Sequence, residues 1–159
     1  MGDLTNLGKK AEKKIREWLD RPEEGLDFNR LYDRMDGWKG SCNICDFTLF
    51  KAPYFYYIES KATRENNFPY TMITDYQYDN MLKKSYIVGV KCYVVVLFAS
   101  HQRAFILNIQ DIAKEKEAGR KSINITKIDK WKIPYIEIRT SPSRKELLDY
   151  DTEQIVDIF

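Results

Sequence analysis

Two acidic residues and a lysine in the first half of the sequence have types and spacing that could support metal-assisted hydrolysis. Asp46 lies in one predicted strand, and Glu59-Ser60-Lys61 ends a second, apolar one. Side chains alternate along a strand, so Glu59 and Lys61 are expected on the same face. Two carboxylates beside an amine are a set that can hold a divalent cation and activate a water molecule.

The turn between the two predicted strands determines which residues face each other. Lys51-Ala52-Pro53 separates them, and Pro53 suits a turn because proline has no N–H for a strand ladder. If the hairpin folds symmetrically about Ala52-Pro53, Asp46 lies directly opposite Glu59. Like charges in that position are destabilising, so a cation should lie between them. Hard oxygen ligands favour Mg²⁺ or Mn²⁺ over zinc. The alternative is a solvated sheet face, with Lys61 in an ordinary surface ion pair.

The elements that position these residues follow from the spacing of apolar side chains. The pattern predicts four helices, four strands, a short helix or bend and a polar loop. The helices are expected at residues 4–19, 74–88, 111–118 and 146–158, and the strands at 43–50, 54–61, 91–99 and 103–109. The bend is expected at 28–35, the loop at 63–70, and a further edge strand at 135–138. This order predicts a mixed α/β fold with helices on both faces of one central sheet.

Length and composition narrow the class of protein. The chain has 159 residues, 43% of them hydrophobic, which predicts a single domain spanning residues 1–159. The longest apolar run, Cys92 to Ala99, has eight residues, far fewer than a membrane helix needs. With no leader-like start and three cysteines, an odd number, we expect reduced thiols in a cytoplasmic protein.

The net charge of +2 means that a nucleic-acid partner would require basic residues gathered on one face. The segment from Lys114 to Lys132 carries seven basic residues against three acidic ones, and the first helix adds five more basic residues. Either could follow a phosphate backbone, or both could be solvated helix faces. Cys42-x-x-Cys45 also invites a zinc interpretation, but it lacks the second tight ligand pair of a structural site.

Several motifs together resemble a known family. The spacing from Asp46 to Glu59-Ser60-Lys61 is similar to the signature of PD-(D/E)XK nucleases, and the surrounding motifs resemble RecU-type Holliday junction resolvases. Those motifs are Gly8-x-x-Ala11-Glu12, Phe28-x-Arg30-Leu31, Glu59-Ser60-Lys61-Ala62-Thr63, Phe68-Pro69 and Ile73-Thr74-Asp75-Tyr76-Gln77. The resemblance covers roughly residues 5–110. It implies a restriction-endonuclease-like core, with a mixed central β-sheet flanked by helices.

The resemblance also implies a role for each matching residue. Asp46, Glu59 and the backbone carbonyl of Ser60 would ligate Mg²⁺, with Mn²⁺ as a substitute, and Glu12 would contribute to the site. Lys61 would orient or deprotonate the attacking water, and Gln77 would lie near the site at the start of its helix. The implied protein is a homodimer, from a bacterial cell or a phage, that cuts four-way DNA junctions.

Two other functions share these sequence features. A duplex-DNA endonuclease of the same fold would use the same residues, and the stretch from Asp33 to Cys45 is shorter than the insertion that RecU-type resolvases project into a junction. Within it, Trp38 and Lys39 could form a small wedge. A non-catalytic DNA-binding or architectural protein is the other alternative, although such a protein has no need for opposed carboxylates.

Overall fold

The computed structural model describes residues 2–32, 43–144 and 147–159. Its helices are α1 (Gly2–Leu19), α2 (Asp75–Ser85), α3 (Ile109–Glu117) and α4 (Ile155–Ile158), with short 3-10 turns at Pro22–Glu24, Tyr70–Met72 and Ala99–His101. Its strands are β1 (Asp27–Arg30), β2 (Phe47–Lys51), β3 (Tyr54–Thr63), β4 (Asn67–Pro69), β5 (Val90–Phe98), β6 (Arg103–Asn108), β7 (Ser122–Asn124), β8 (Ile136–Ile138), β9 (Thr140–Arg144) and β10 (Leu147–Tyr150).

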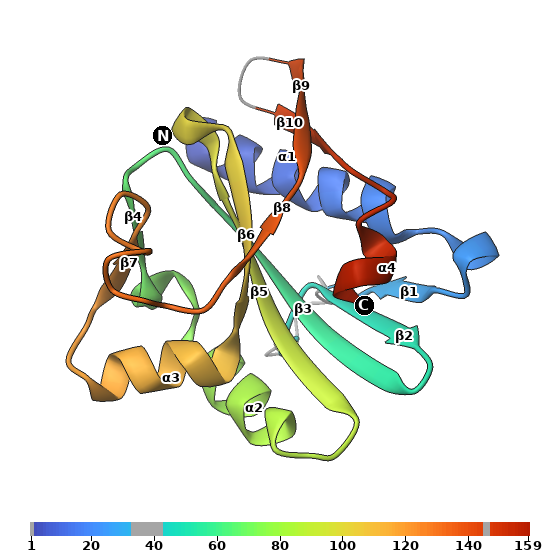
Figure 1. Ribbon diagram of the computed structural model, residues 1–159, viewed down its shortest axis with the longest axis horizontal. Helices are drawn as coiled ribbons and strands as arrows, with labels where there is room; N and C mark the ends of the chain where they lie inside the picture. The colour runs from blue at the N-terminus through green and yellow to red at the C-terminus, as the bar shows by residue number, and fades with distance from the viewer. Residues whose placement is uncertain (1, 33–42, 145–146) are drawn as a thin grey trace.

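A six-stranded sheet forms the centre of the molecule, in the order β1-β2-β3-β5-β6-β8 (Figure 1). β3 and β5 run parallel, and the other neighbours in this sheet are antiparallel. β4–β7 and β9–β10 form two separate two-stranded sheets. The predicted class, a mixed central sheet flanked by helices, is therefore confirmed. No helix in the described part of the chain is both long and apolar enough to span a membrane.

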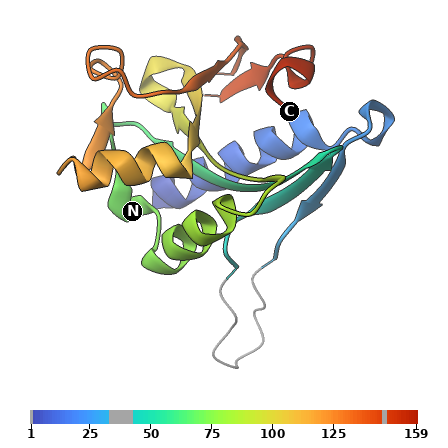
Figure 2. The same cartoon turned by 60° about the horizontal axis from the view of Figure 1, so that its bottom comes forward.

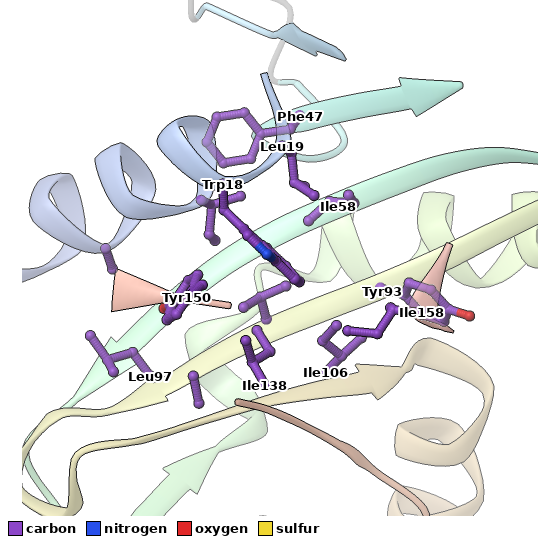
Figure 3. Close-up of a cluster of buried hydrophobic side chains, with 14 of the residues drawn as sticks. Trp18, Leu19, Phe47, Ile58, Tyr93, Leu97, Ile106, Ile138, Tyr150 and Ile158 are labelled. Carbon is purple, nitrogen blue, oxygen red and sulfur yellow. The ribbon is translucent and has the colours of Figure 1, made fainter. Parts of the chain in front are cut away.

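α1 packs on one face of the sheet because its apolar residues recur every three or four positions. Leu7, Ala11, Ile15 and Trp18 are buried in a cluster with Ile58 and other residues from that face. β10 and α4 complete the cluster, which Figure 3 shows around the ring of Trp18, with Tyr150 and Ile158 in the same group. The N-terminal helix and the C-terminal segment therefore stabilise the sheet from the same side.

The other face of the sheet is covered by α2 and α3, which Figure 2 shows side by side. Met81 from α2 and Ile112 from α3 are buried there with Val94 and Val96 of β5. Val95 and Leu97 of the same strand are buried on the α1 face. Burial on both faces explains why β5 is an almost continuous apolar run, as the sequence predicted.

Two predicted elements are wrong. The segment expected as a helix or bend from Phe28 begins as strand β1, because its pairing with β2 lets Phe28 stack on Phe47, with ring centroids 5.2 Å apart. The helix expected at 146–158 is strand β10 followed by the single turn α4. Leu148 and Tyr150 are both buried, which is the two-residue period of a strand.

The polar loop expected at residues 63–70 also contains an element that was not predicted. Asn67–Pro69 forms strand β4, which pairs with β7, a strand that the sequence pattern missed. Phe68 and Ile123, opposite each other in this ladder, are both fully buried. The pairing joins the segment before α2 to the basic segment after α3.

Candidate active site

The two acids of the proposed site meet where β2 begins beside the middle of β3. The hairpin ladder runs from Lys51↔Tyr54 to Phe47↔Ile58, which is the register that the sequence predicted. Asp46 directly precedes this ladder, and its Oδ2 accepts a 2.8 Å hydrogen bond from the backbone N–H of Ser60. The carboxylate of Asp46 therefore lies against the Glu59-Ser60 segment, as expected.

Glu59 is a buried acid with one satisfied and one unsatisfied oxygen. It is 1% exposed, although it lies beside the more open Lys61. Its Oε1 lies 2.5 Å from Nζ of Lys61 and accepts a 2.9 Å hydrogen bond from Nε2 of Gln77. Its Oε2 is also buried and has no hydrogen-bond partner among the described residues. A buried, unpaired carboxylate oxygen is costly unless a ligand satisfies it.

The electrostatics of Glu59 show the same imbalance. The pKa of this carboxyl is raised from 4.5 to about 7, mainly by burial and next by the negative charge of Asp46. The charge of Lys61 and the hydrogen bonds from Lys61 and Gln77 lower the pKa but do not offset the first two effects. One lysine is therefore not enough to compensate the two neighbouring acids.

Gln77 is held in place by the start of α2. Thr74 is the N-cap, and its hydroxyl accepts a hydrogen bond from the backbone N–H of Gln77. The Oε1 of Gln77 accepts one in return from the backbone N–H of Thr74, which completes a capping box. With its oxygen committed to the helix end, the side-chain amide presents its NH₂ group to Glu59. The sequence predicted the place of Gln77 but not this double role.

Glu12 lies on α1 and is bound by a residue that sequence reasoning did not assign to the site. Its Oε2 accepts a 2.6 Å hydrogen bond from the guanidinium of Arg30. Arg30 is the register partner of Phe47, the residue that follows Asp46. Among the described residues, no three acidic, histidine or cysteine side chains converge in a metal-binding arrangement. The structure therefore brings Asp46, Glu59, Lys61 and Gln77 together, and it gives Glu12 on α1 a partner in Arg30.

The donor set fits a hard divalent cation. Asp46 and Glu59 would supply carboxylate oxygens, with the unpaired Oε2 of Glu59 as the atom most in need of a partner. The backbone carbonyl of Ser60 would complete the protein ligands, as the resemblance implied. Mg²⁺ commonly takes one or two carboxylates and keeps several waters, so two acids suffice.

Cys45 and Cys92 are buried free thiols. Burial raises the pKa of Cys45 to about 12, so the metal-free thiol is protonated at neutral pH. Cys42, Trp38 and Lys39 lie outside the described residues. His101 contacts Asn66 at 2.6 Å.

The sequence of this chain matches a known protein family. The family described as RecU, Recombination protein U, matches residues 40–150. The chain belongs to the RecU family. The matched residues of this RecU-family protein include Asp46, Glu59, Lys61 and Gln77, whereas Glu12 on α1 precedes them.

The RecU-family protein also resembles a solved structure. That structure is Hjc from Archaeoglobus fulgidus, a Holliday junction resolvase from an archaeal hyperthermophile. It has 15% sequence identity and a TM-score of 0.47, over 65% of this chain and 78% of Hjc. No curated protein matches the chain.

Proposed function

We propose that this RecU-family protein is a metal-dependent endonuclease that cleaves branched DNA by in-line hydrolysis, acting as a Holliday junction resolvase. The observation that carries the proposal is the buried carboxylate of Glu59, which faces Asp46 and has one oxygen without a hydrogen-bond partner among the described residues. Family membership supports the choice of DNA junctions as substrate. A protein that only bound DNA would gain nothing from keeping two acids together at this cost.

Asp46, Glu59 and the Ser60 carbonyl would hold Mg²⁺, or Mn²⁺ in its place. When bound, the cation would supply Lewis-acid stabilisation of the charge that develops on the phosphate and on the leaving 3′ oxygen. The same cation would neutralise the acid pair and satisfy the buried Oε2 of Glu59. Ser60 also fixes Asp46, since its backbone N–H holds one carboxylate oxygen at 2.8 Å.

Lys61 is the residue placed to act on the attacking water. Its Nζ lies 2.5 Å from Oε1 of Glu59, and its side chain is 18% exposed, so it reaches both the acid pair and solvent. In this position it would orient the water and hold or accept its proton. Gln77 acts as a positioning residue, because its amide fixes the Oε1 side of Glu59 and leaves Oε2 available.

Resolution of a four-way junction requires two symmetric cuts, so we propose that the protein works as a homodimer. Two identical sites related by a two-fold axis would cut strands of the same polarity.

Glu12 would act from outside the acid pair, with Arg30 as its partner. We propose that this pair supports the Asp46 end of β2, in addition to the metal role that the family resemblance implied for Glu12.

The test compares linear, forked and four-way DNA of matched length, with Mg²⁺, Mn²⁺ or EDTA. The parent should cut the four-way substrate fastest, and only with a divalent cation. Asp46→Asn should lose the activity while still binding the junction, because the replacement keeps the shape and removes the charge. Equal rates on linear and four-way DNA would instead indicate a duplex endonuclease. Junction binding without cleavage under any metal would indicate an architectural protein.

A further inference from the structure

A second region with charged side chains and an unsatisfied polar group lies beside the first turn of α2, on the side away from Glu59. A cavity of about 380 Å³ opens between the segment before α2 and the end of α3. We call this cavity the Lys121 pocket. Its lining includes Tyr70, Asp75, Lys116, Gly119, Arg120 and Lys121. Three of these side chains are basic and one is acidic.

Local pairing explains how these residues come together. β4 pairs with β7, and the backbone N–H of Tyr70 extends the contact by donating to the carbonyl of Lys121 at 3.0 Å. α3 ends just before, and Gly119 adopts a positive φ of +85° that turns the chain back towards β7. Of the basic residues in the segment 114–132, only Lys116, Arg120 and Lys121 line this pocket.

Arg120 is held in a fixed position at the wall of the pocket. Its Nε lies 2.5 Å from a carboxylate oxygen of Glu115, and its guanidinium lies over the ring of Trp131, 4.4 Å from the centroid. An arginine fixed in this way loses little side-chain entropy when it binds an anion. Glu115 balances its charge, which leaves Lys116 and Lys121 as the excess over Asp75.

Tyr70 supplies the observation that points to a ligand. The residue is 5% exposed, and its hydroxyl is buried without a hydrogen-bond partner among the described residues. Burial and the nearby charge of Glu115 raise the pKa of Tyr70, so the hydroxyl remains a donor. Tyr70 lines a cavity with excess positive charge, and its hydroxyl is a donor without a partner among the described residues, a combination that suits an anionic ligand.

We propose that the Lys121 pocket binds a backbone phosphate of the DNA strand that passes the acid pair. The inference rests on the proposed function and adds to it a second point of contact. Asp75 lines the pocket, and Gln77, two residues later in α2, contacts Glu59. Residues two apart in a helix project from opposite sides. The first turn of α2 therefore lies between the Lys121 pocket and Glu59. A strand held at both would have its register fixed relative to the cut.

The experiment measures binding of a four-way junction in EDTA, where cleavage cannot occur, as a function of salt. Lys121→Ala and Lys116→Ala are compared with Lys114→Ala, which removes the same charge from α3 but lies outside the pocket, paired with Asp111. Each pocket variant should bind roughly three- to tenfold more weakly, with the salt slope reduced by about one. The Lys114 variant should stay within about twofold of the parent. Equal losses in all three would overturn the proposal.

Tyr70→Phe removes the unsatisfied hydroxyl without changing the charge. It should raise the Tm of the free protein, because a buried donor without a partner is lost, and should weaken junction binding. A structural role for the hydroxyl gives the opposite signs, with a lower Tm and unchanged binding, and contradicts the proposal.

A titration with inorganic phosphate, followed by amide NMR shifts, separates this inference from the proposed function. Shifts at Gly119 and Lys121 that vanish in Lys121→Ala would support an anion pocket even if the parent failed to bind junctions, in which case only the proposed function would fall. Phosphate shifts combined with normal junction binding by the pocket variants would assign the pocket to free phosphate and overturn the DNA assignment. Absence of any shift would also overturn it.

Discussion

Two glutamate–cation pairs in the same sheet differ in how completely the glutamate is satisfied. Glu137, near the β8 edge, is 41% exposed, and its two oxygens accept hydrogen bonds of 2.7 and 2.8 Å from Arg103. Glu59, in the interior, is 1% exposed, shares one oxygen between Lys61 and Gln77, and keeps the other without a partner among the described residues.

The difference shows what separates a structural ion pair from a candidate site. Arg103 and Glu137 match each other in charge and geometry, so nothing further is needed. Glu59 and Asp46 bring two negative charges to one lysine in a poorly solvated place. Such an arrangement persists when a ligand satisfies it. The following predictions test this contrast, from the largest expected effect to the smallest.

Lys61→Ala should have the largest effect on activity. We expect junction cleavage in Mg²⁺ to fall by about 10²–10⁴-fold, because the group that we propose orients or deprotonates the water is lost. Single-turnover cleavage of a labelled four-way junction measures the rate. Arg103→Ala removes the cation of the other pair and is the matched control, expected to cut at the parental rate. A similar rate loss in both would show that the two pairs are equivalent.

Glu59→Gln should stabilise the metal-free protein at pH 8 and should also slow cleavage. The pKa of Glu59 is raised in the folded state, to about 7 from 4.5. Below pH 4.5 the acid is protonated in both folded and unfolded states, so it costs nothing there. As the pH rises from 4.5 to 7, the unfolded state loses its proton first, and the parent loses stability on the order of 1–3 kcal/mol.

Urea denaturation in EDTA at pH 4 and pH 8 measures this difference. The variant should match the parent at pH 4 and exceed it at pH 8. Adding Mg²⁺ should stabilise the parent and leave the variant unchanged, because ligand binding to the folded state adds stability. Glu137→Gln provides the control, with no gain at pH 8. Destabilisation of Glu59→Gln at pH 8 would mean that the charge of Glu59 is already compensated by the protein.

Thr74→Ala should lower both the stability of the protein and the rate of cleavage. Loss of the N-cap should cost about 1 kcal/mol of stability. Without the capping box, the amide of Gln77 is free to rotate away from Glu59, so cleavage should slow about tenfold with little change in junction affinity. Asn108→Ala removes the N-cap of α3, which contacts Gln110 rather than the acids, and should cost similar stability without slowing cleavage. Equal rates for the two variants would remove the positioning role.

Glu137→Ala should have the smallest effect. An ion pair with this exposure contributes about 0.2–1 kcal/mol, so thermal unfolding should shift by a few degrees at most. Cleavage and metal affinity should not change. A large loss of activity would show that the β8 edge contributes to the site.

The sequence could predict the parts of the site that depend on local geometry. The short turn at Ala52-Pro53 and the two strands beside it are adjacent in the chain, so the hairpin register followed directly from their pattern. Likewise, the apolar run of β5 required burial on both faces. The spacing of apolar residues predicted a helix at 74–88, and α2 begins at Asp75 with Thr74 as its N-cap.

The parts that failed depend on partners distant in the chain. β1 is a strand because β2 is available to pair with it, and Asp27–Arg30 alone carries too few residues to indicate this. The contact between Glu12 and Arg30 joins α1 to β1, two elements whose proximity no spacing rule reveals. The basic segment was recognised, but only the β4–β7 pairing shows that Lys121 lies beside Tyr70.

The turn of the β2–β3 hairpin has a consequence for which sequence changes this protein can tolerate. Its tip, Ala52-Pro53, lies five ladder pairs away from the acids, and at about 3.3 Å per residue this distance is too great for its side chains to take part in chemistry. Substitutions there that preserve the turn should therefore leave the acid pair in place. Deleting one residue, however, would shift the ladder by one step and send Asp46 and Glu59 to opposite faces. The candidate site therefore depends on the length of this remote loop.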